Sequence, residues 1–308
     1  LEELVHPERV QPATVEIVDI AGLVKGASKG EGLGNQFLGN IRECHAIIHV
    51  LRCFDNDNIV HVEGSVDPIR DKETIDIELQ LKDLEVLGKA IEKAKKQIKS
   101  GKKEDVQTYE TLEALLKGIS ARAVELSEEE QELSQSYQLL TAKPILYVCN
   151  VDEASAASGN KYVEAVREAV KNENAQVIVL AVATEADIAE LETYEERQLF
   201  LQDMGLGEPG ASVLIRAAYR LLNLQTYFTA GVKEVRAWTI PVGATAPQAA
   251  GVIHSDFERG FIRAEVIAYE DFISYGSESK VKEAGKMRVE GKEYVVKDGD
   301  IMHFRFNV

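Results

Sequence analysis

The sequence predicts an α/β fold, in which a doubly wound, mostly parallel sheet carries an inserted helical hairpin and a small C-terminal β-rich domain. Short apolar runs rich in valine and isoleucine alternate with helical patterns, as in sheets whose strands are buried on both faces. One long stretch between two of these runs has heptad-like apolar spacing. The last part of the chain, of about 85 residues, changes to short strands separated by Gly and Pro, which is a normal size for a domain.

Four apolar runs are the expected strands of the parallel sheet, and each ends in polar residues. They cover residues 15–19, 46–51, 144–150 and 176–182. A helical pattern over 162–172 separates the last two. Ligands of such sheets bind beyond the carboxyl ends of the strands. We therefore expect Asp19, Asn150 and the residues after Leu180 at the binding edge.

The helical stretch lies between the second and third runs. Its apolar residues step by three or four: Ile77, Leu81, Leu84, Leu87, Ile91, Ala94 and Ile98. Ser100-Gly101 interrupts the pattern, and helical spacing then resumes as far as Ile119. Two helices joined by a short turn pair antiparallel. The expected domains are therefore the α/β domain at 1–77 and 142–222, the hairpin at 78–141, and the C-terminal domain at 223–308.

Composition limits the possible functions. The 308 residues include 52 acidic and 35 basic ones, and a net charge of −17 argues against a protein that coats nucleic acid, so no DNA partner is expected. No apolar run is long enough for a membrane span, so no membrane partner is expected. Three scattered cysteines without a CxxC pair favour reduced thiols in a cytoplasmic protein. Residues 78–103 hold eight lysines against four acidic residues, which indicates either a solvated helix face or a contact for RNA phosphate.

The first chemical motif is Asp19-Ile-Ala-Gly22, the D-x-x-G arrangement of P-loop NTPases. In that arrangement the carboxylate of Asp19 holds Mg²⁺, usually through water, and the amide of Gly22 approaches a γ-phosphate. D-x-x-G alone is a weak signal, because many turns after strands contain it. The glycine-rich stretch up to Gly34 strengthens it, since a nucleotide-gated loop uses the backbone freedom of glycine.

The second motif is Asn150-Val-Asp-Glu153, at the place where G-domain NTPases read guanine with N-K-x-D. Val151 replaces the lysine, and Glu153 replaces the aspartate that accepts two donors from guanine. The longer carboxylate misplaces that contact, so we expect guanine discrimination to be lost and a true GTPase to be disfavoured. Ala181 and Val182 occupy the place of a further loop that contacts the base.

Five segments together carry a resemblance to a known family: 19–37, 150–153, 223–238, 253–262 and 306–308. They resemble the YchF family, a branch of the Obg-type, translation-factor-related P-loop NTPases, and the resemblance covers the whole chain. It implies a P-loop NTPase G domain, a coiled-coil-like helical insert and a C-terminal ubiquitin-like β-grasp (TGS) domain linked to RNA and ribosome contacts. It also implies Mg²⁺ and ATP as cofactors, with ATP preferred over GTP.

One element of the family pattern is absent from the sequence. No G-x-x-x-x-G-K-[ST] occurs, and the chain begins at Leu1 instead of Met. Family members carry this P-loop ahead of the residues that match Leu1 onward, so we expect an N-terminal segment that this sequence lacks. Two functions follow as alternatives. The first is a slowly hydrolysing ATPase switch that associates with the ribosome or RNA, and the second is an adaptor that binds RNA or protein without nucleotide.

The sequence offers one candidate for a catalytic residue. Many G proteins place a Gln directly after D-x-x-G to orient the attacking water. Leu23 stands there and cannot hydrogen-bond water. The nearest polar candidate is His61, whose neutral imidazole can accept from water, and the resemblance supports that role. The alternative is a loop histidine without chemistry.

In the C-terminal domain, the sequence predicts strands over 235–240, 261–268, 293–296 and 302–306, with a turn at 297–300. Arg259 and Arg263 are the candidates for RNA contacts in this domain. Because its charges nearly balance, any such contact must be a local patch.

Overall fold

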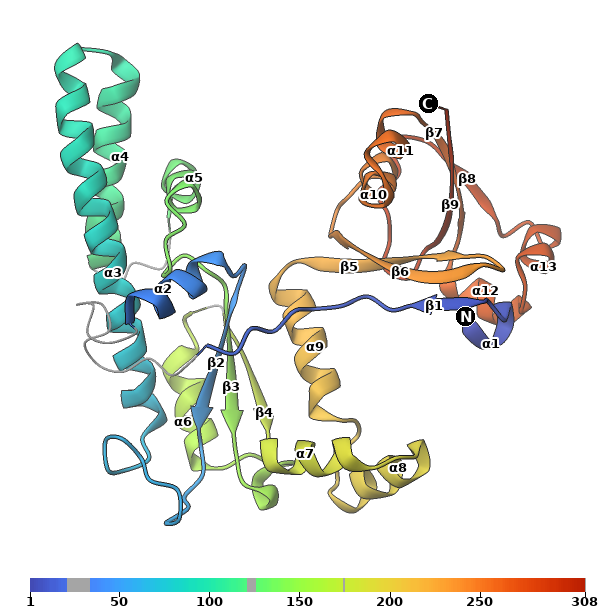
Figure 1. Cartoon of the computed structure of the whole chain (residues 1–308), viewed down its shortest axis with the longest axis horizontal. Coiled ribbons are helices and arrows are strands. Elements are labelled where there is room, and N and C mark those ends of the chain that lie inside the picture. The colour runs from blue at the N-terminus through green and yellow to red at the C-terminus, as the bar shows by residue number, and fades with distance from the viewer. Residues whose placement is uncertain (21–33, 121–125, 174, 308) are drawn as a thin grey trace. The chain divides into compact units, whose positions relative to one another are not determined.

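The computed structural model describes residues 1–20, 34–120, 126–173 and 175–307 (Figure 1). The chain divides into two compact units. One unit is Val18–Ala217, and the other joins Leu1–Ile17 to Ala218–Val308.

The first unit contains a parallel sheet in the order β2-β3-β4. Its strands are β2 (Ile47–Arg52), β3 (Ile145–Asn150) and β4 (Gln176–Leu180), and both neighbouring pairs are parallel. Helix α6 (Lys161–Val170) buries Val163, Val166 and Val170 in one cluster with residues of β2 and β3. The last three apolar runs of the sequence are therefore confirmed as parallel strands.

The first apolar run is not a strand, contrary to expectation. Residues 12–20 are in no sheet, and Ile17 and Val18 are 55% and 51% exposed. Alternation of valine and isoleucine gives a segment the capacity for β structure, but a strand exists only where a neighbouring backbone pairs with it. In the described sheet, β2 pairs with β3 alone.

The helical insert is built on α3 (Pro68–Gln97). Asp67 begins it, accepting hydrogen bonds from Ile69 N and Arg70 N at 3.1 Å each, and Pro68 occupies the first helical position, where its missing N–H costs nothing. A short 3-10 turn, η2 (Ile98–Ser100), ends at Gly101, whose φ of 72° suits glycine. The boundary expected between residues 77 and 78 thus falls inside one continuous helix.

Helix α4 (Lys103–Ser120) returns beside α3, as Figure 1 shows. Leu87, Ile91 and Ala94 of α3 pack against Leu112 and Leu115 of α4 in a buried cluster. The antiparallel hairpin is therefore confirmed, and α5 (Glu128–Ser136) adds a third helix that begins with a Ser127–Glu130 capping box.

The apolar contact between α3 and α4 begins later along α3 than the sequence predicts. Ile77 and Leu81 are each 42% exposed, and Leu79 is buried in their place. At this end of α3 the contact with α4 is polar, from Gln80 Nε2 to Ile119 O, and Leu79 packs against α2 through another face.

The remaining helices of this unit follow the same chain order. They are α2 (Gly34–Glu43), η3 (Glu153–Ser155), α7 (Val182–Glu190), α8 (Tyr194–Asp203) and α9 (Gly210–Leu221), which runs on into the second unit. Across the described residues, no helix combines the length and apolar character needed to cross a bilayer.

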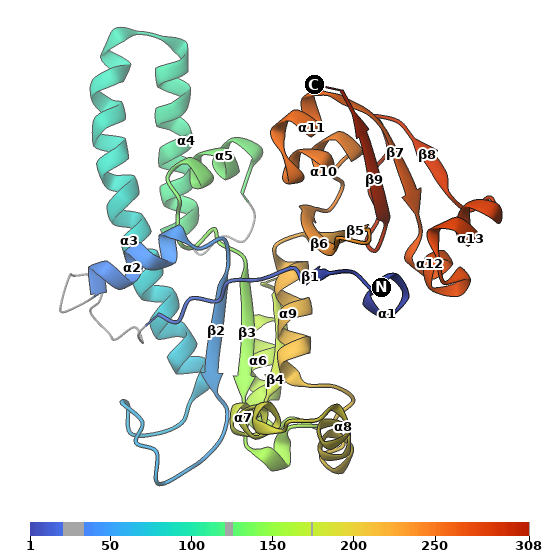
Figure 2. The same cartoon turned by 45° about the vertical axis from the view of Figure 1, so that its right-hand side comes forward.

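The second unit contains a mixed sheet in the order β1-β6-β5-β9-β7-β8. Its strands are β1 (Arg9–Gln11), β5 (Leu224–Ala230), β6 (Glu234–Pro241), β7 (Phe261–Ile267), β8 (Arg288–Glu290) and β9 (Ile301–Phe306). Its helices are α1 (Glu2–Val5), α10 (Ala246–Ile253), α11 (Ser255–Arg259), α12 (Tyr269–Tyr275) and α13 (Glu278–Glu283). Figure 2 shows β7 between β8 and β9. Ala246, Ala249 and Ala250 of α10 are fully buried, because small side chains let the helix approach the sheet closely.

Three expected strands of this domain are confirmed as β6, β7 and β9, but the segment 293–296 is not a strand. Val295 makes only an isolated bridge with Thr245, while the side chain of Val296 is buried in the core. The turn expected at 297–300 is present, with Gly299 at a φ of 84°. β1 pairs in parallel with β6, which places the N-terminal residues with this domain.

Candidate functional site

The carboxyl ends of β3 and β4 bring three of the predicted site residues together. Asn150 is the last residue of β3, and its Oδ1 accepts a hydrogen bond from the backbone N of Val182 at 3.1 Å. Val182 is the first residue of α7, and Ala181 is the N-cap of that helix and is buried. The hydrogen bond to Oδ1 fixes the side-chain amide of Asn150. Its NH₂ group remains a donor at the edge where ligands of parallel sheets bind.

Val151 follows Asn150 but points into the protein. Its side chain is 3% exposed, in the cluster that β2 and β3 form with α6, and its backbone N donates to Leu180 O at 2.9 Å. Of the predicted base-site residues, Val151 can thus face a ligand only with its backbone. Glu153 is exposed and opens η3, which Asp152 caps by accepting from Ser155 N at 2.9 Å.

The predicted phosphate and metal residues are only partly described. Asp19 lies exposed in an extended segment, whereas Gly22 and Leu23 lie outside the described residues. Within the described ranges, no group of three His, Cys, Asp or Glu side chains could hold a metal ion. Mg²⁺ in nucleotide sites is usually held by one or two carboxylates together with phosphates and water. A single exposed carboxylate at Asp19 fits that chemistry.

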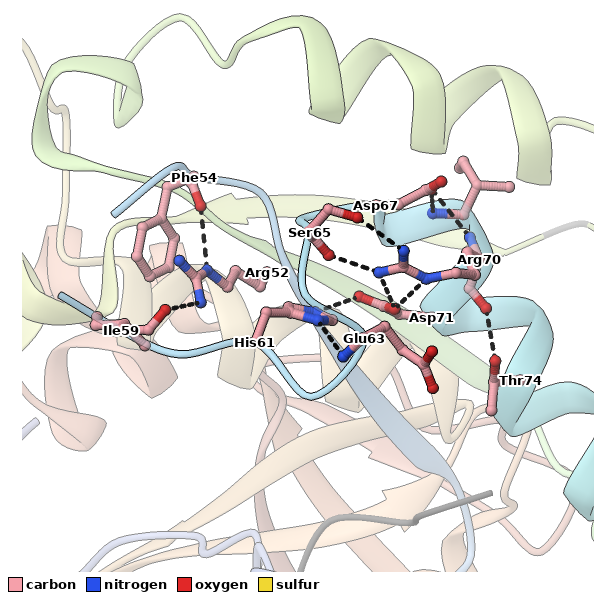
Figure 3. A network of polar contacts seen from close by, with 11 residues as sticks. Arg52, Phe54, Ile59, His61, Glu63, Ser65, Asp67, Arg70, Asp71 and Thr74 are labelled. Carbon is pink, nitrogen blue, oxygen red and sulfur yellow. Dashed lines mark hydrogen bonds and ion pairs between the residues drawn. The ribbon is translucent and has the colours of Figure 1, made fainter. Parts of the chain in front are cut away.

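His61 is held by two hydrogen bonds, as Figure 3 shows. The backbone N of Glu63 donates to its Nδ1 at 3.1 Å, and its Nε2 lies 2.9 Å from Oδ2 of Asp71, at the start of α3. Because Nδ1 accepts a hydrogen bond, the proton of the neutral ring belongs on Nε2, which donates to Asp71. The flanking Val60 and Val62 are 91% and 89% exposed, whereas the side chain of His61 is 16% exposed and turns inward.

Two arginines fix the ends of the loop that carries His61. Arg52, the last residue of β2, donates to the backbone oxygens of Phe54 and Ile59 at 3.2 and 2.9 Å (Figure 3) and to that of Asn56 at 3.1 Å. These contacts organise the first half of the loop around one guanidinium group.

Arg70 organises the second half of the loop. It donates to Oγ and O of Ser65 at 3.0 and 2.6 Å and to Oδ1 of Asp71 at 3.2 Å. Asp71 therefore uses one carboxylate oxygen for Arg70 and the other for His61, which fixes both side chains at the start of α3.

A further set of contacts ties the loop to α6. The Nδ2 of Asn160 donates to Cys53 O at 2.8 Å, while its Oδ1 caps α6 by accepting from Tyr162 N at 3.0 Å. The hydroxyl of Tyr162 donates to Asp55 at 2.8 Å, and this bond raises the pKa of the tyrosine. The loop is thus anchored to β2, α3 and α6 of the same unit.

Sequence reasoning selected His61 but missed the residues that hold it. Arg52, Arg70, Asp71 and Asn160 stand in no motif. The one local signal was Asp67-Pro68, a helix-start pattern that places Asp71 on the first turn of α3. Its contact with His61 depends on how a ten-residue loop folds back, which spacing does not encode.

The architecture and the site define a class of protein: a G-domain-like α/β protein with a helical insert and a C-terminal β domain. Comparison with known proteins agrees with it. Residues 224–307 match the C-terminal YchF-GTPase family model, described as a protein of unknown function (DUF933), and residues 4–87 match a model described as 50S ribosome-binding GTPase.

Whole-chain relatives make the family specific. The chain is 58% identical over 312 residues to the ribosome-binding ATPase YchF of Haemophilus ducreyi, covering 100% of this chain and 85% of that protein. It is 55% identical over 314 residues to that of Bacillus subtilis, covering 100% and 86%. The structure of the Schizosaccharomyces pombe YchF GTPase superposes with a TM-score of 0.85 at 37% identity, over 99% of this chain and 83% of that one. The chain belongs to the YchF family of ribosome-binding ATPases.

Proposed function

We propose that this protein is a cytoplasmic switch NTPase that binds ATP in preference to GTP, hydrolyses it slowly with Mg²⁺, and associates with the ribosome. The observation that carries the nucleotide part is the 3.1 Å hydrogen bond from Val182 N to Asn150 Oδ1. It joins two loops at the carboxyl ends of β3 and β4 and orients a side-chain donor for a base. The names of the relatives, ribosome-binding ATPases, support the same reaction and partner.

The base preference follows from the residues around Asn150. The amide of Asn150 can donate to a ring nitrogen that adenine and guanine share, so it does not discriminate between them. Discrimination depends on the carboxylate after it, and Glu153 is longer than the aspartate that pairs with guanine. The side chain of Val151 is committed to the core, so it adds no polar group to the pocket.

The phosphate side of the site is assigned to Asp19 and Gly22. Asp19 would hold Mg²⁺ through water, and the Gly22 amide would contact the terminal phosphate. Bound Mg²⁺ supplies charge neutralisation on the phosphates. The protein groups hold the reacting atoms in position. The loop that carries His61 is firmly held, so it can contribute to turnover in this way.

His61 is the proposed residue for orienting the attacking water, with Asp71 as its positioning residue. Both ring nitrogens are engaged in the structure, so this role requires the bond from Glu63 N to Nδ1 to open while Asp71 keeps hold of Nε2. An Asp on one ring nitrogen fixes the tautomer that leaves the other nitrogen as an acceptor for water.

Nucleotide competition tests the base site. We expect ATP to displace a fluorescent adenine nucleotide at a lower concentration than GTP does. In the Glu153→Asp variant, the concentrations of ATP and GTP that are needed for displacement should lie closer together. Val151 stays unchanged in this test because a lysine there would enter the core. Tighter binding of GTP by the unaltered chain would contradict the proposal.

Hydrolysis measurements test His61 and Asp71. We expect His61→Ala to lower kcat by about 10²-fold or more, the usual contribution of acid–base groups, with little change in ATP affinity. Asp71→Asn should lower kcat less and alter its pH profile, because the amide can present NH₂ to the ring. Unchanged hydrolysis by His61→Ala, with ATP still bound, would refute the assignment.

A further inference from the structure

A single carboxylate, that of Glu185, joins the first turn of α7 to the first turn of α9. The backbone N of Glu185 donates to Ala181 O at 3.0 Å, which closes the first turn of α7. The side chain reaches the start of α9, where Oε1 accepts from Gly210 N at 2.7 Å and Oε2 accepts from Ala211 N at 3.1 Å. We call these two hydrogen bonds from α9 to Glu185 the Glu185 clamp.

The start of α9 depends on this distant residue for its acceptors. The first amides of a helix have no carbonyl partner within the helix, and a carboxylate also suits the positive end of the helix dipole. The nearest carboxylate along the chain is that of Glu208, but it is bound by Arg216. The acceptors come instead from a residue 25 positions earlier, on another helix.

Gly210 brings α9 very close to the end of β4. A Cβ at Gly210 would lie 2.3 Å from Cδ2 of Leu180 and 2.8 Å from Oε1 of Glu185. Leu180 is the buried last residue of β4, and its carbonyl oxygen accepts from Val151 N at 2.9 Å. Any side chain at Gly210 would therefore push α9 away from the strand end that leads into the candidate base site.

The Glu185 clamp lies three residues from the hydrogen bond that orients Asn150. Val182 N donates to Asn150 Oδ1 at 3.1 Å, and Val182 and Glu185 both belong to the first turn of α7. The backbone hydrogen bonds of a helical turn fix its residues relative to one another. Holding Glu185 on α9 therefore also holds Val182 N opposite Asn150.

We propose that Glu185 is a positioning residue of the nucleotide base site, which it keeps assembled by fixing the first turn of α7 on α9. This role rests on the adenine nucleotide site proposed above. Without the Glu185 clamp, the loop at Ala181 and Val182 adopts several arrangements, of which one orients the amide of Asn150 for a base. The apparent affinity for nucleotide falls with the fraction of molecules in that arrangement. The phosphates are assigned to other residues, so Glu185 acts on affinity and not on the hydrolytic step.

Two substitutions in the full chain disturb the Glu185 clamp from its two sides. Glu185→Ala removes the acceptor of both amides, whereas Gly210→Ala keeps the carboxylate and forces α9 away from Leu180. Alanine is itself favourable in a helix, so the effect of Gly210→Ala comes from the lost close approach. The matched controls are Glu190→Ala, at the exposed last residue of α7, and Gly207→Ala, where a Cβ would meet no described atom within 4 Å.

Titration with a fluorescent adenine nucleotide measures the dissociation constant. We expect Glu185→Ala and Gly210→Ala to raise it about tenfold, the change that follows if the competent arrangement falls to about a tenth of the molecules. The KM for ATP should rise in parallel, whereas kcat at saturating ATP should stay within about twofold of that of the unaltered chain. Glu185→Gln retains one acceptor oxygen and should have an intermediate affinity. Both controls should bind the nucleotide as the unaltered chain does.

Amide hydrogen exchange tests the Glu185 clamp without nucleotide. In a chain with isotopically labelled valine, the N–H of Val182 is protected by Asn150 Oδ1, and its exchange should become about tenfold faster in Glu185→Ala. The N–H of Val148, buried in β3, is the internal reference and should keep its rate. Urea denaturation of each variant reports the global stability separately.

Several results would overturn the proposal. If Glu185 only caps α9, Glu185→Ala lowers the free energy of unfolding but changes neither the nucleotide affinity nor the exchange of Val182. A loss of affinity as large in Glu190→Ala would show that the charge of α7 matters and the Glu185 clamp does not. An unaltered chain that binds no adenine nucleotide contradicts the proposed function and this role with it. Equal nucleotide affinity with and without Glu185 contradicts only the positioning role.

Discussion

The buried carboxylate of Asp83 should be the main polar tie between α3 and the chain that returns from the hairpin. It is fully buried and accepts hydrogen bonds from Leu140 N at 2.9 Å and from Thr141 N and Oγ1 at 2.8 Å each. Burial raises the pKa of Asp83, and these three donors oppose that rise. Asp83→Ala would leave two backbone N–H groups without their acceptor.

The magnitude follows from those groups. An unsatisfied buried donor costs about 1–3 kcal/mol, and removal of the buried charge returns part of that cost. We therefore expect Asp83→Ala to lower the free energy of unfolding by about 2–4 kcal/mol, and Asp83→Asn, which retains one acceptor oxygen, by about 1–3 kcal/mol.

Urea denaturation followed by circular dichroism measures both values, with the midpoint and the slope m reported separately. Asp187→Asn, at an exposed position of α7, is the matched control and should change the stability by less than about 0.5 kcal/mol. A loss below about 1 kcal/mol for Asp83→Ala would show that the hydrogen bonds at the base of the hairpin contribute little. The account of how the insert is anchored would then be wrong.

Two further predictions concern the same unit. Gly88→Ala should raise the free energy of unfolding, measured by urea denaturation, by about 0.5–1 kcal/mol. Alanine favours the helix interior, and a Cβ at this position meets no atom within 4 Å. A lower unfolding midpoint for the variant would contradict this prediction. Burial lowers the pKa of His49 below its usual value of 6.5. The stability that its neutral form provides is therefore present above pH 6.5 and is lost as the pH falls through the pKa of His49 in the folded protein. Denaturation measured at each pH should show that His49→Gln loses less stability than the unaltered chain between about pH 7 and 5.

The sequence was most informative where a structural feature depends on neighbours along the chain. The runs that became β2, β3 and β4 could be recognised from continuous apolar residues, and the hairpin from its period of three and four. The turn at Gly101 was visible because glycine adopts a positive φ without cost. These features also placed Asn150 at a strand end.

Features that depend on distant pairing could not be predicted in this way. β1 is a strand because its backbone meets β6, more than two hundred residues later, whereas the more apolar segment 15–19 pairs with no described strand. The tether of His61 is of the same kind: it requires Asp71, Arg70 and the loop geometry together. The sequence pattern shows which segments can form a strand, but a segment forms one only where another backbone pairs with it.

The continuity of α3 connects the proposed position of His61 to the distal end of the hairpin. The helix carries Asp71 in its first turn and Lys93 and Lys96 near its end, and thirty residues span about 45 Å. Its middle is held by the hydrogen bonds of Asp83, so a displacement of the tip of the hairpin can reach His61 only if α3 tilts as a unit. Gly88 is the position in the distal half where bending costs least, since it contributes no side chain to the core. If α3 bends at Gly88, a displacement of the tip does not reach His61. If α3 stays straight, the displacement reaches His61 through Asp71.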